Sequence, residues 1–116
     1  MKIETRTVGD VGILDCSGRI LIEGTMDIRN NVRDILNRGL RKIVLNLADV
    51  NYIDSPGIGE IASAYTTVMN NGGQLKLLNL TKKIHELLKA TGLDSVFQIF
   101  DDEQSAIDSF NQENFR

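Results

Sequence analysis

The sequence is short of several features, and each shortage excludes a class of protein. No apolar run approaches the roughly 20 residues of a membrane-spanning helix, and the opening MKIETRTV lacks the apolar core of a signal peptide. The single cysteine, Cys16, cannot form an internal disulfide. A net charge of −3, with acids and bases spread along the chain, leaves no basic face for nucleic acid. We therefore expect a soluble cytoplasmic protein with no membrane span and no nucleic acid as its main partner.

Residues for catalysis or metal binding are equally scarce. His85 is the only histidine and has no cysteine nearby, so it is expected at the surface and not at a metal site. The sequence shows no Ser–His–Asp set and no pair of catalytic carboxylates. Asp49 and Asp54 flank a predicted loop and are better explained as solvated acids, or as groups that orient Ser55. Cys16 is expected to be a small core residue. We predict a protein that is not an enzyme and uses no cofactor and no metal.

Proline is also rare, and the only one, Pro56, does not mark a domain boundary. The chain has 116 residues, of which 41% are hydrophobic, and it contains no repeat, low-complexity stretch or linker. This length and composition suit one domain with its own apolar core. We predict a single domain over residues 1–116 and leave its oligomeric state open.

Hydrophobic periodicity predicts alternating strands and helices. A turn at Gly9 and Asp10 joins the first two strands into an antiparallel hairpin. Later strands are separated by helices, which implies parallel pairing through right-handed crossovers. The result is an α/β domain with a mixed sheet of four to five strands and three to four helices. Strands are expected at 3–8, 11–16, 42–47, 74–80 and, as a short strand or extended segment, 96–100, and helices at 25–38, 56–71, 81–91 and 101–110.

The stretch NYIDSPGIGE, residues 51–60, contains the most informative serine of the chain. Ser55 precedes Pro56, and a residue before proline is pushed toward the extended geometry that a helix N-cap needs. Proline itself is favoured at the first helical position. The pattern predicts that Ser55 caps a helix and that its oxygen accepts a hydrogen bond from the N–H of Gly57 or Ile58.

Two glycines, Gly57 and Gly59, lie outside the apolar stripe of this predicted helix, whose inward residues are expected to be Ile58, Ile61, Ala62, Tyr65, Val68 and Met69. A helix face without side chains allows another molecule to approach closely, and a helix N-terminus favours anions. From the residues alone, two interpretations stay open. Ser55 is either a cap and nothing more, or an accessible serine on a docking surface whose affinity is set by phosphorylation.

A third interpretation concerns nucleotide binding. Residues 57–62 spell G-x-G-x-x-A after a strand, as in dinucleotide-binding folds. The next strand, however, ends in Asn79 where such folds have an acid for the ribose. The domain also has no room for a second nucleotide-binding half. These two observations disfavour nucleotide binding.

Two longer stretches carry a family resemblance. IVLNLADVNYIDSPGIGEI, residues 43–61, resembles the signature of STAS domains, in particular bacterial anti-sigma factor antagonists, and the resemblance continues through NGGQLKLLNLTKKIHELLKATGLDSVF, residues 71–97. It implies that Ser55, directly after Asp54, is the phosphorylation site. The partner-binding surface is expected around it, at Asp54, Ser55, Pro56, Gly57, Ile58 and Gly59.

The resemblance implies a partner-switching role. The unphosphorylated antagonist would bind an anti-sigma factor that is also a serine kinase, and this binding would release a sigma factor. Phosphorylation of Ser55 would end the binding, and a PP2C-type phosphatase would reverse it. Alternatives are a constitutive STAS scaffold subunit of a stress-signalling or transporter complex, or a small nucleotide-binding module.

The chain departs from the family pattern in two places. Pro56 stands where a small residue such as Ser, Thr or Ala usually follows the phosphorylated serine. Leu21 stands where many members carry an aspartate, in a predicted turn that begins at Gly18 and Arg19 and continues into residues 22–24. The second departure makes that edge of the surface more apolar than in the family.

Overall fold

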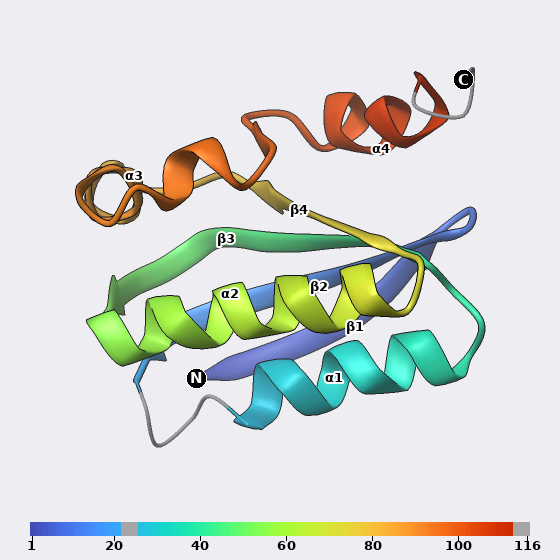
Figure 1. Ribbon diagram of the computed structural model, residues 1–116, viewed down its shortest axis with the longest axis horizontal. Helices are drawn as coiled ribbons and strands as arrows, with labels where there is room; N and C mark the ends of the chain where they lie inside the picture. The colour runs from blue at the N-terminus through green and yellow to red at the C-terminus, as the bar shows by residue number, and fades with distance from the viewer. Residues whose placement is uncertain (22–25, 113–116) are drawn as a thin grey trace.

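The computed structural model describes residues 1–21 and 26–112 and shows one mixed five-stranded sheet in the order β1-β2-β3-β4-β5 (Figure 1). The first strand pairs antiparallel with the second, with Val8 opposite Val11 across the predicted Gly9–Asp10 turn. The other three pairs are parallel. The predicted α/β fold class is confirmed. The strands are β1 (Lys2–Val8), β2 (Val11–Ile20), β3 (Lys42–Ile53), β4 (Gln74–Leu78) and β5 (Ile99–Phe100).

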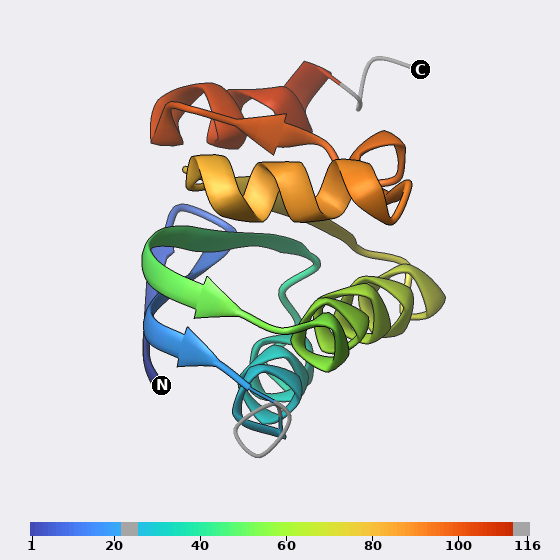
Figure 2. The same cartoon turned by 90° about the vertical axis from the view of Figure 1, so that its left-hand side faces the viewer.

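Helices cover the two faces of the sheet unequally. Figures 1 and 2 show α1 (Met26–Asn37) and α2 (Ser55–Asn70) on one side and α4 (Glu103–Gln112) on the other. Between β4 and β5 the chain forms α3 (Lys82–Ala90) and a short 3-10 helix, η2 (Leu93–Ser95). Through Ile84 and Leu88, α3 joins the same buried cluster as α1 and α2. The smaller cluster under α4 consists of Val11, Ile13, Val44, Leu78, Ala106 and Phe110.

Polar contacts also attach α4 to the sheet. Arg6 on β1 pairs with Asp15 on β2, with 2.6 Å between Nε and Oδ2, and with Glu103 on α4. The hydrogen bonds that Arg6 donates to Glu103 and then to Asp15 raise the pKa of the Arg6 guanidinium, and the bond from Arg6 lowers the pKa of Asp15. Lys76 is only 1% exposed, and its Nζ donates to Ser109 Oγ at 2.6 Å. These contacts join segments far apart in sequence.

Strands β2 and β3 are longer than predicted. Residues 17–20 and 48–53 continue both strands because they pair with each other, Gly18 with Val50 and Ile20 with Ile53, across two register shifts. Asp49 therefore lies in a strand, and the prediction that it flanks a loop is wrong. Conversely, β4 ends before residue 79, since Asn79 has a φ of 59°, a left-handed conformation that asparagine tolerates better than most residues.

The inward stripe of α2 differs in part from the predicted one. Ile58, Ile61 and Val68 are buried as predicted, and Ala64 is buried in addition. Ala62 and Tyr65 are half-buried, whereas Met69 is 47% exposed. The expectation for Met69 is wrong because a single large apolar side chain at a surface carries little penalty, so periodicity alone could not place it.

Candidate phosphorylation and partner-binding site

Ser55 lies at the junction between the strand β3 and the helix α2. Figure 2 shows β3 leading directly into α2 beside the end of β2, and Ser55 is the first residue of α2. Its side chain is exposed. Among the residues that the structure describes, its hydroxyl has no hydrogen-bond partner. An exposed hydroxyl without a partner is an accessible acceptor for a phosphoryl group.

The helix cap is Asp54, so the prediction that Ser55 is the cap is wrong. Asp54 has extended geometry, with φ −95° and ψ 173°, and its Oδ1 accepts a hydrogen bond from the N–H of Gly57 at 2.7 Å. Its carbonyl accepts from Ile58 at 3.0 Å. Pro56 then falls in the first turn, where the missing N–H is no loss even at the second position. Ser55 is thereby free of any capping duty.

Gly57 allows α2 to approach the end of β2. A Cβ at this position would lie 2.7 Å from the carbonyl oxygen of Ile20 and 2.9 Å from Ile53 Cγ1. The same Ile20 carbonyl accepts a hydrogen bond from the N–H of Asp54 at 3.3 Å. Gly57 is therefore a packing requirement. Gly59, by contrast, is exposed and has open space around its Cβ position.

The predicted partner-binding residues divide into two groups. Ser55, Pro56 and Gly59 are exposed, and Asp54 is half-buried. Gly57 and Ile58 are buried, so they can shape the surface without touching a partner. Partner binding by these six residues stays a prediction.

The arrangement does not favour a nucleotide at the glycine end of α2. The Gly57 N–H, which would have to face a phosphate, already binds the Asp54 carboxylate. A carboxylate at that position repels a second anion. The G-x-G-x-x-A pattern here reflects close packing at Gly57 and an open face at Gly59.

His85 and Cys16 lie outside the site. His85 is exposed on α3, as predicted. Cys16 is a core residue that is 3% exposed, and burial raises the pKa of its thiol to about 12. In the described ranges 1–21 and 26–112, no group of three metal-ligand side chains exists. No helix within those ranges is long and apolar enough to cross a membrane. Leu21 is half-buried, and residues 22–24 lie outside the described ranges.

The molecule has a groove beside Ser55 that the sequence did not predict. It has a volume of about 350 Å³ and lies between the last residues of β3 and the helix α3. We call this the α3 groove, and its main lining residues are Tyr52, Ile53, Thr81, Ile84, Leu87 and Ala90. The sequence offered only two adjacent large side chains, Tyr52 and Ile53. They could not locate the groove, because the packing of α3 beside the end of β3 requires the tertiary fold.

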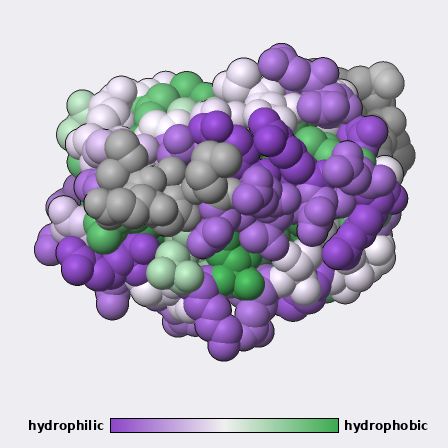
Figure 3. All heavy atoms as spheres, turned by 90° about the horizontal axis from the view of Figure 1, so that it is seen from below, coloured by the Kyte–Doolittle hydropathy of each residue, from purple (hydrophilic) through white to green (hydrophobic). Residues whose placement is uncertain are grey.

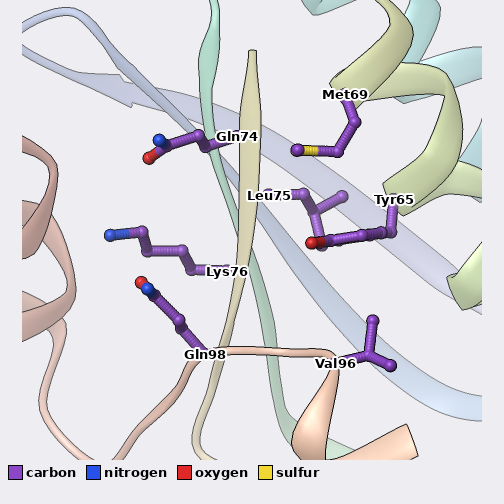
Figure 4. A pocket seen from close by; sticks show the side chains of 7 residues that line it. All are labelled: Tyr65, Met69, Gln74, Leu75, Lys76, Val96 and Gln98. Atoms are coloured by element: carbon purple, nitrogen blue, oxygen red, sulfur yellow. The ribbon is translucent and has the colours of Figure 1, made fainter. Parts of the chain in front are cut away.

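A second hollow is remote from Ser55. It has a volume of about 140 Å³ and lies near the start of β4 (Figure 4). Its lining includes Tyr65 and Met69 on the last turns of α2, and Figure 4 shows their side chains facing Leu75 and Val96. Met69 and Ser55 lie near opposite ends of α2, about 20 Å apart along the helix axis. This hollow is therefore not part of the site.

The face seen in Figure 3 is also a poor candidate for an apolar partner. Viewed from below Figure 1, the coloured part of this face is mostly hydrophilic, and its hydrophobic spots are small and separate. The apolar area next to Ser55 is instead the α3 groove.

Capping by Asp54 leads to a measurable contrast. We expect Asp54→Ala to lower the free energy of unfolding by about 1 kcal/mol, because a lost N-cap typically costs that much. Ser55→Ala should change it by less than about 0.5 kcal/mol, because an exposed hydroxyl without a partner contributes little. Urea unfolding followed by circular dichroism would measure both. If both variants lose the same free energy of unfolding, the conclusion that Asp54 alone caps α2 is wrong.

Known proteins are similar to this chain in sequence. The profile of the STAS domain matches residues 2–106. A protein of Thermotoga maritima, provisionally named an anti-sigma factor antagonist, is 34% identical over 97 residues, which cover 83% of this chain and 86% of that protein. The anti-sigma-B factor antagonist of Bacillus subtilis is 40% identical over 53 residues, which cover 46% of this chain and 49% of that protein.

Solved structures agree with the sequence comparison. A crystal structure of a Thermotoga maritima protein of the same provisional name has a TM-score of 0.84 at 31% identity and covers 92% of both chains. The anti-sigma factor antagonist SpoIIAA in its unphosphorylated form has a TM-score of 0.80 at 18% identity and covers 96% of this chain and 97% of its own. The phosphorylated form of Bacillus SpoIIAA has a TM-score of 0.73 at 19% identity and covers 94% and 99%. With a domain match over most of its length and relatives above 30% identity, this chain belongs to the STAS domain family.

Proposed function

We propose that this protein is an anti-sigma factor antagonist that is switched at Ser55. In its unphosphorylated form it binds an anti-sigma factor with serine kinase activity, and the bound anti-sigma factor releases its sigma factor. The kinase then phosphorylates Ser55 and the complex separates. A PP2C-type phosphatase restores the binding form. Ser55 acts as a substrate, so the protein itself performs no catalysis, and we place the cycle in the cytoplasm, where sigma factors work.

The proposal rests on the exposure of Ser55 and on the absence of a capping role for its side chain. Its hydroxyl is exposed and has no hydrogen-bond partner in the described part of the chain, because Asp54 supplies the cap. A kinase can therefore modify it without breaking a contact that holds α2. The names of the relatives support the direction of the proposal, since they describe anti-sigma factor antagonists.

The electrostatics of the site support release on phosphorylation. A phosphate adds about −1.5 to −2 charges at pH 7. On Ser55 it would follow directly after the carboxylate of Asp54, which is already engaged by Gly57. Two adjacent negative groups in an interface are costly to desolvate unless the partner supplies cations. The phosphate can end binding in this way without a change of fold.

The test is intact-mass spectrometry after incubation with ATP and each purified anti-sigma factor kinase of the source organism. We expect one added phosphate on the wild-type chain and on Ser105→Ala, a control at another exposed helical serine. Ser55→Ala should gain none. A kinase that binds the protein but adds no phosphate would contradict the switch and would favour the constitutive scaffold. Phosphate on the wild type would also show that Pro56 is compatible with the kinase.

A further inference from the structure

Next to the site, an arginine is stacked on an exposed tyrosine. Arg19 and Tyr52 are paired at the carboxyl ends of β2 and β3. The guanidinium carbon of Arg19 lies 4.9 Å from the centre of the Tyr52 ring. Tyr52 is 41% exposed, and Arg19 is exposed as well. In the described part of the chain, Arg19 forms no ion pair.

This stacking prepares Arg19 to bind an anion. A guanidinium that lies on an aromatic ring has less side-chain freedom to lose, and its planar donors match a carboxylate in a bidentate arrangement. No acid within the described residues occupies these donors. The pair therefore offers an oriented positive group on the protein surface.

The same tyrosine also lines the α3 groove. The groove has mainly apolar walls from Ile53, Ile84, Leu87 and Ala90, and Lys83 and Glu86 stand at its polar margin. Its lining comes from the end of β3 and from α3, so the groove lies between these two elements, and Figure 2 shows α3 above the end of β3. Arg19, Tyr52 and the groove thus form one continuous surface with a cation at one end and apolar walls at the other.

The helix beside this surface has a net positive charge. The helix α3 has the sequence KKIHELLKA, with three lysines and one glutamate. Arg19 adds a further positive charge, and none of the ion pairs in the described part of the chain involves Arg19 or a residue of α3. The complementary partner surface is therefore acidic. The groove in addition requires an apolar side chain to fill it.

The surface is continuous with the switch serine. Tyr52 and Ile53 immediately precede Asp54 and Ser55 in the chain. The residue after Arg19, Ile20, accepts the hydrogen bond from the N–H of Asp54 at 3.3 Å. A partner that covers Ser55 and extends toward the end of β3 would also contact the Arg19–Tyr52 pair and the α3 groove.

We propose that Arg19 and the α3 groove bind an acidic amphipathic segment of the anti-sigma factor. A carboxylate of this segment pairs with the Arg19 guanidinium, and an adjacent apolar side chain enters the groove between Tyr52 and Leu87. This inference rests on the proposed function and adds the residues that select the partner. It assigns partner recognition to a surface beside Ser55, while Ser55 itself controls release.

The test uses two substitutions and two matched controls. Arg19→Glu reverses the charge of the stacked pair, and Arg33→Glu does the same at an exposed position on α1. Ala90→Trp fills the groove from an exposed position, and His85→Trp adds the same side chain to α3 outside the groove. We expect Arg19→Glu and Ala90→Trp to weaken the Kd for the purified kinase by about tenfold or more. The controls should stay within about twofold. Isothermal titration calorimetry would measure all four.

The possible results separate this inference from the proposed function. If the wild type is phosphorylated on Ser55 and all four variants bind equally well, the docking surface is refuted and the switch stands. If the wild type binds no anti-sigma factor kinase, both ideas fail. If Ala90→Trp changes the mass of the protein in sedimentation equilibrium and leaves kinase binding intact, the groove holds a second copy of this chain and the inference is wrong.

A measurement on the wild type removes any dependence on folding of the variants. Titration of the isotope-labelled protein with unlabelled kinase, followed by NMR, should shift the amide signals of Tyr52 and α3 and the Arg19 side-chain signal. Signals from Met69 and Val96 at the second hollow should not move. Shifts confined to α1 or to the second hollow would overturn the proposal.

Discussion

Replacing Ser55 with aspartate is expected to weaken binding to the anti-sigma factor by roughly 30-fold to several thousandfold, since an unpaired charge in an interface costs about 2–5 kcal/mol. The new carboxylate would follow directly after that of Asp54, whose Oδ1 already accepts from Gly57. A partner arranged to cover a neutral serine supplies no cation there. Full phosphorylation carries more charge than aspartate and should have at least the same effect.

The fold should tolerate this change. The Ser55 side chain is exposed and makes no hydrogen bond within the described residues. An acid in the first turn of a helix is also favoured by the helix dipole. Binding would be measured by isothermal titration calorimetry, and stability by thermal unfolding. Ser55→Ala should keep wild-type affinity, and Ser105→Asp, a control with the same added charge on α4, should keep it too.

Two outcomes would contradict the charge mechanism. If Ser55→Asp binds the kinase as tightly as wild type, negative charge at this position does not control release. If Ser55→Ala loses affinity as strongly as Ser55→Asp, the hydroxyl itself is a binding contact and the switch works by removing it.

The second large effect concerns the two glycines, which the sequence pattern treats alike. Gly57→Ala is expected to lower the free energy of unfolding by about 1–3 kcal/mol, as overpacking in a tight site does. The new Cβ would lie 2.7 Å from the Ile20 carbonyl oxygen, which is backbone and cannot swing away as a side chain can. Either the start of α2 shifts or the hydrogen bond between Asp54 and Ile20 is lost.

Gly59→Ala should have the opposite sign. Apart from its chain neighbours and the backbone of its own helical turns, no atom of the described residues lies within 4 Å of its Cβ position, and alanine is favoured over glycine inside a helix by up to about 1 kcal/mol. Urea unfolding of the two single variants measures both effects against the same wild type. A loss of stability in Gly59→Ala, or none in Gly57→Ala, would show that α2 begins with a different packing from the one described here.

Much of the architecture could be predicted from local pattern. The hairpin turn follows from the turn-forming residues Gly9 and Asp10 between two strands. The buried parts of β3 and β4 follow from short apolar runs, which local sequence records directly. The continuation of β2 and β3 over residues 17–20 and 48–53 could not be predicted. Those segments are strands because they pair with each other. Residues 17–20 do not alternate between apolar and polar, and in residues 48–53 the buried side chains are Val50 and Ile53, three positions apart.

At the candidate site, too, local sequence predicted some features and tertiary contacts set the others. Ser55 followed by Pro56 predicted a helix start, and the family resemblance implied that Ser55 is the phosphorylation site. The choice of cap between neighbouring Asp54 and Ser55 depends on where the chain leaves β3, and the hydrogen bond between Asp54 and Ile20 on another strand sets that point. A local rule could therefore locate the cap only to within one residue.

By itself, the sequence determined the α/β class, the start of a helix at residues 54–56 and the position of the serine within it, because these depend on periodicity and on the backbone preferences of neighbouring residues. Only the tertiary structure decided that Gly57 is required by packing while Gly59 is open. It also decided that Tyr52 lies under Arg19 and beside α3. These facts depend on contacts between strands and helices that are distant in the chain, and no local pattern encodes such contacts.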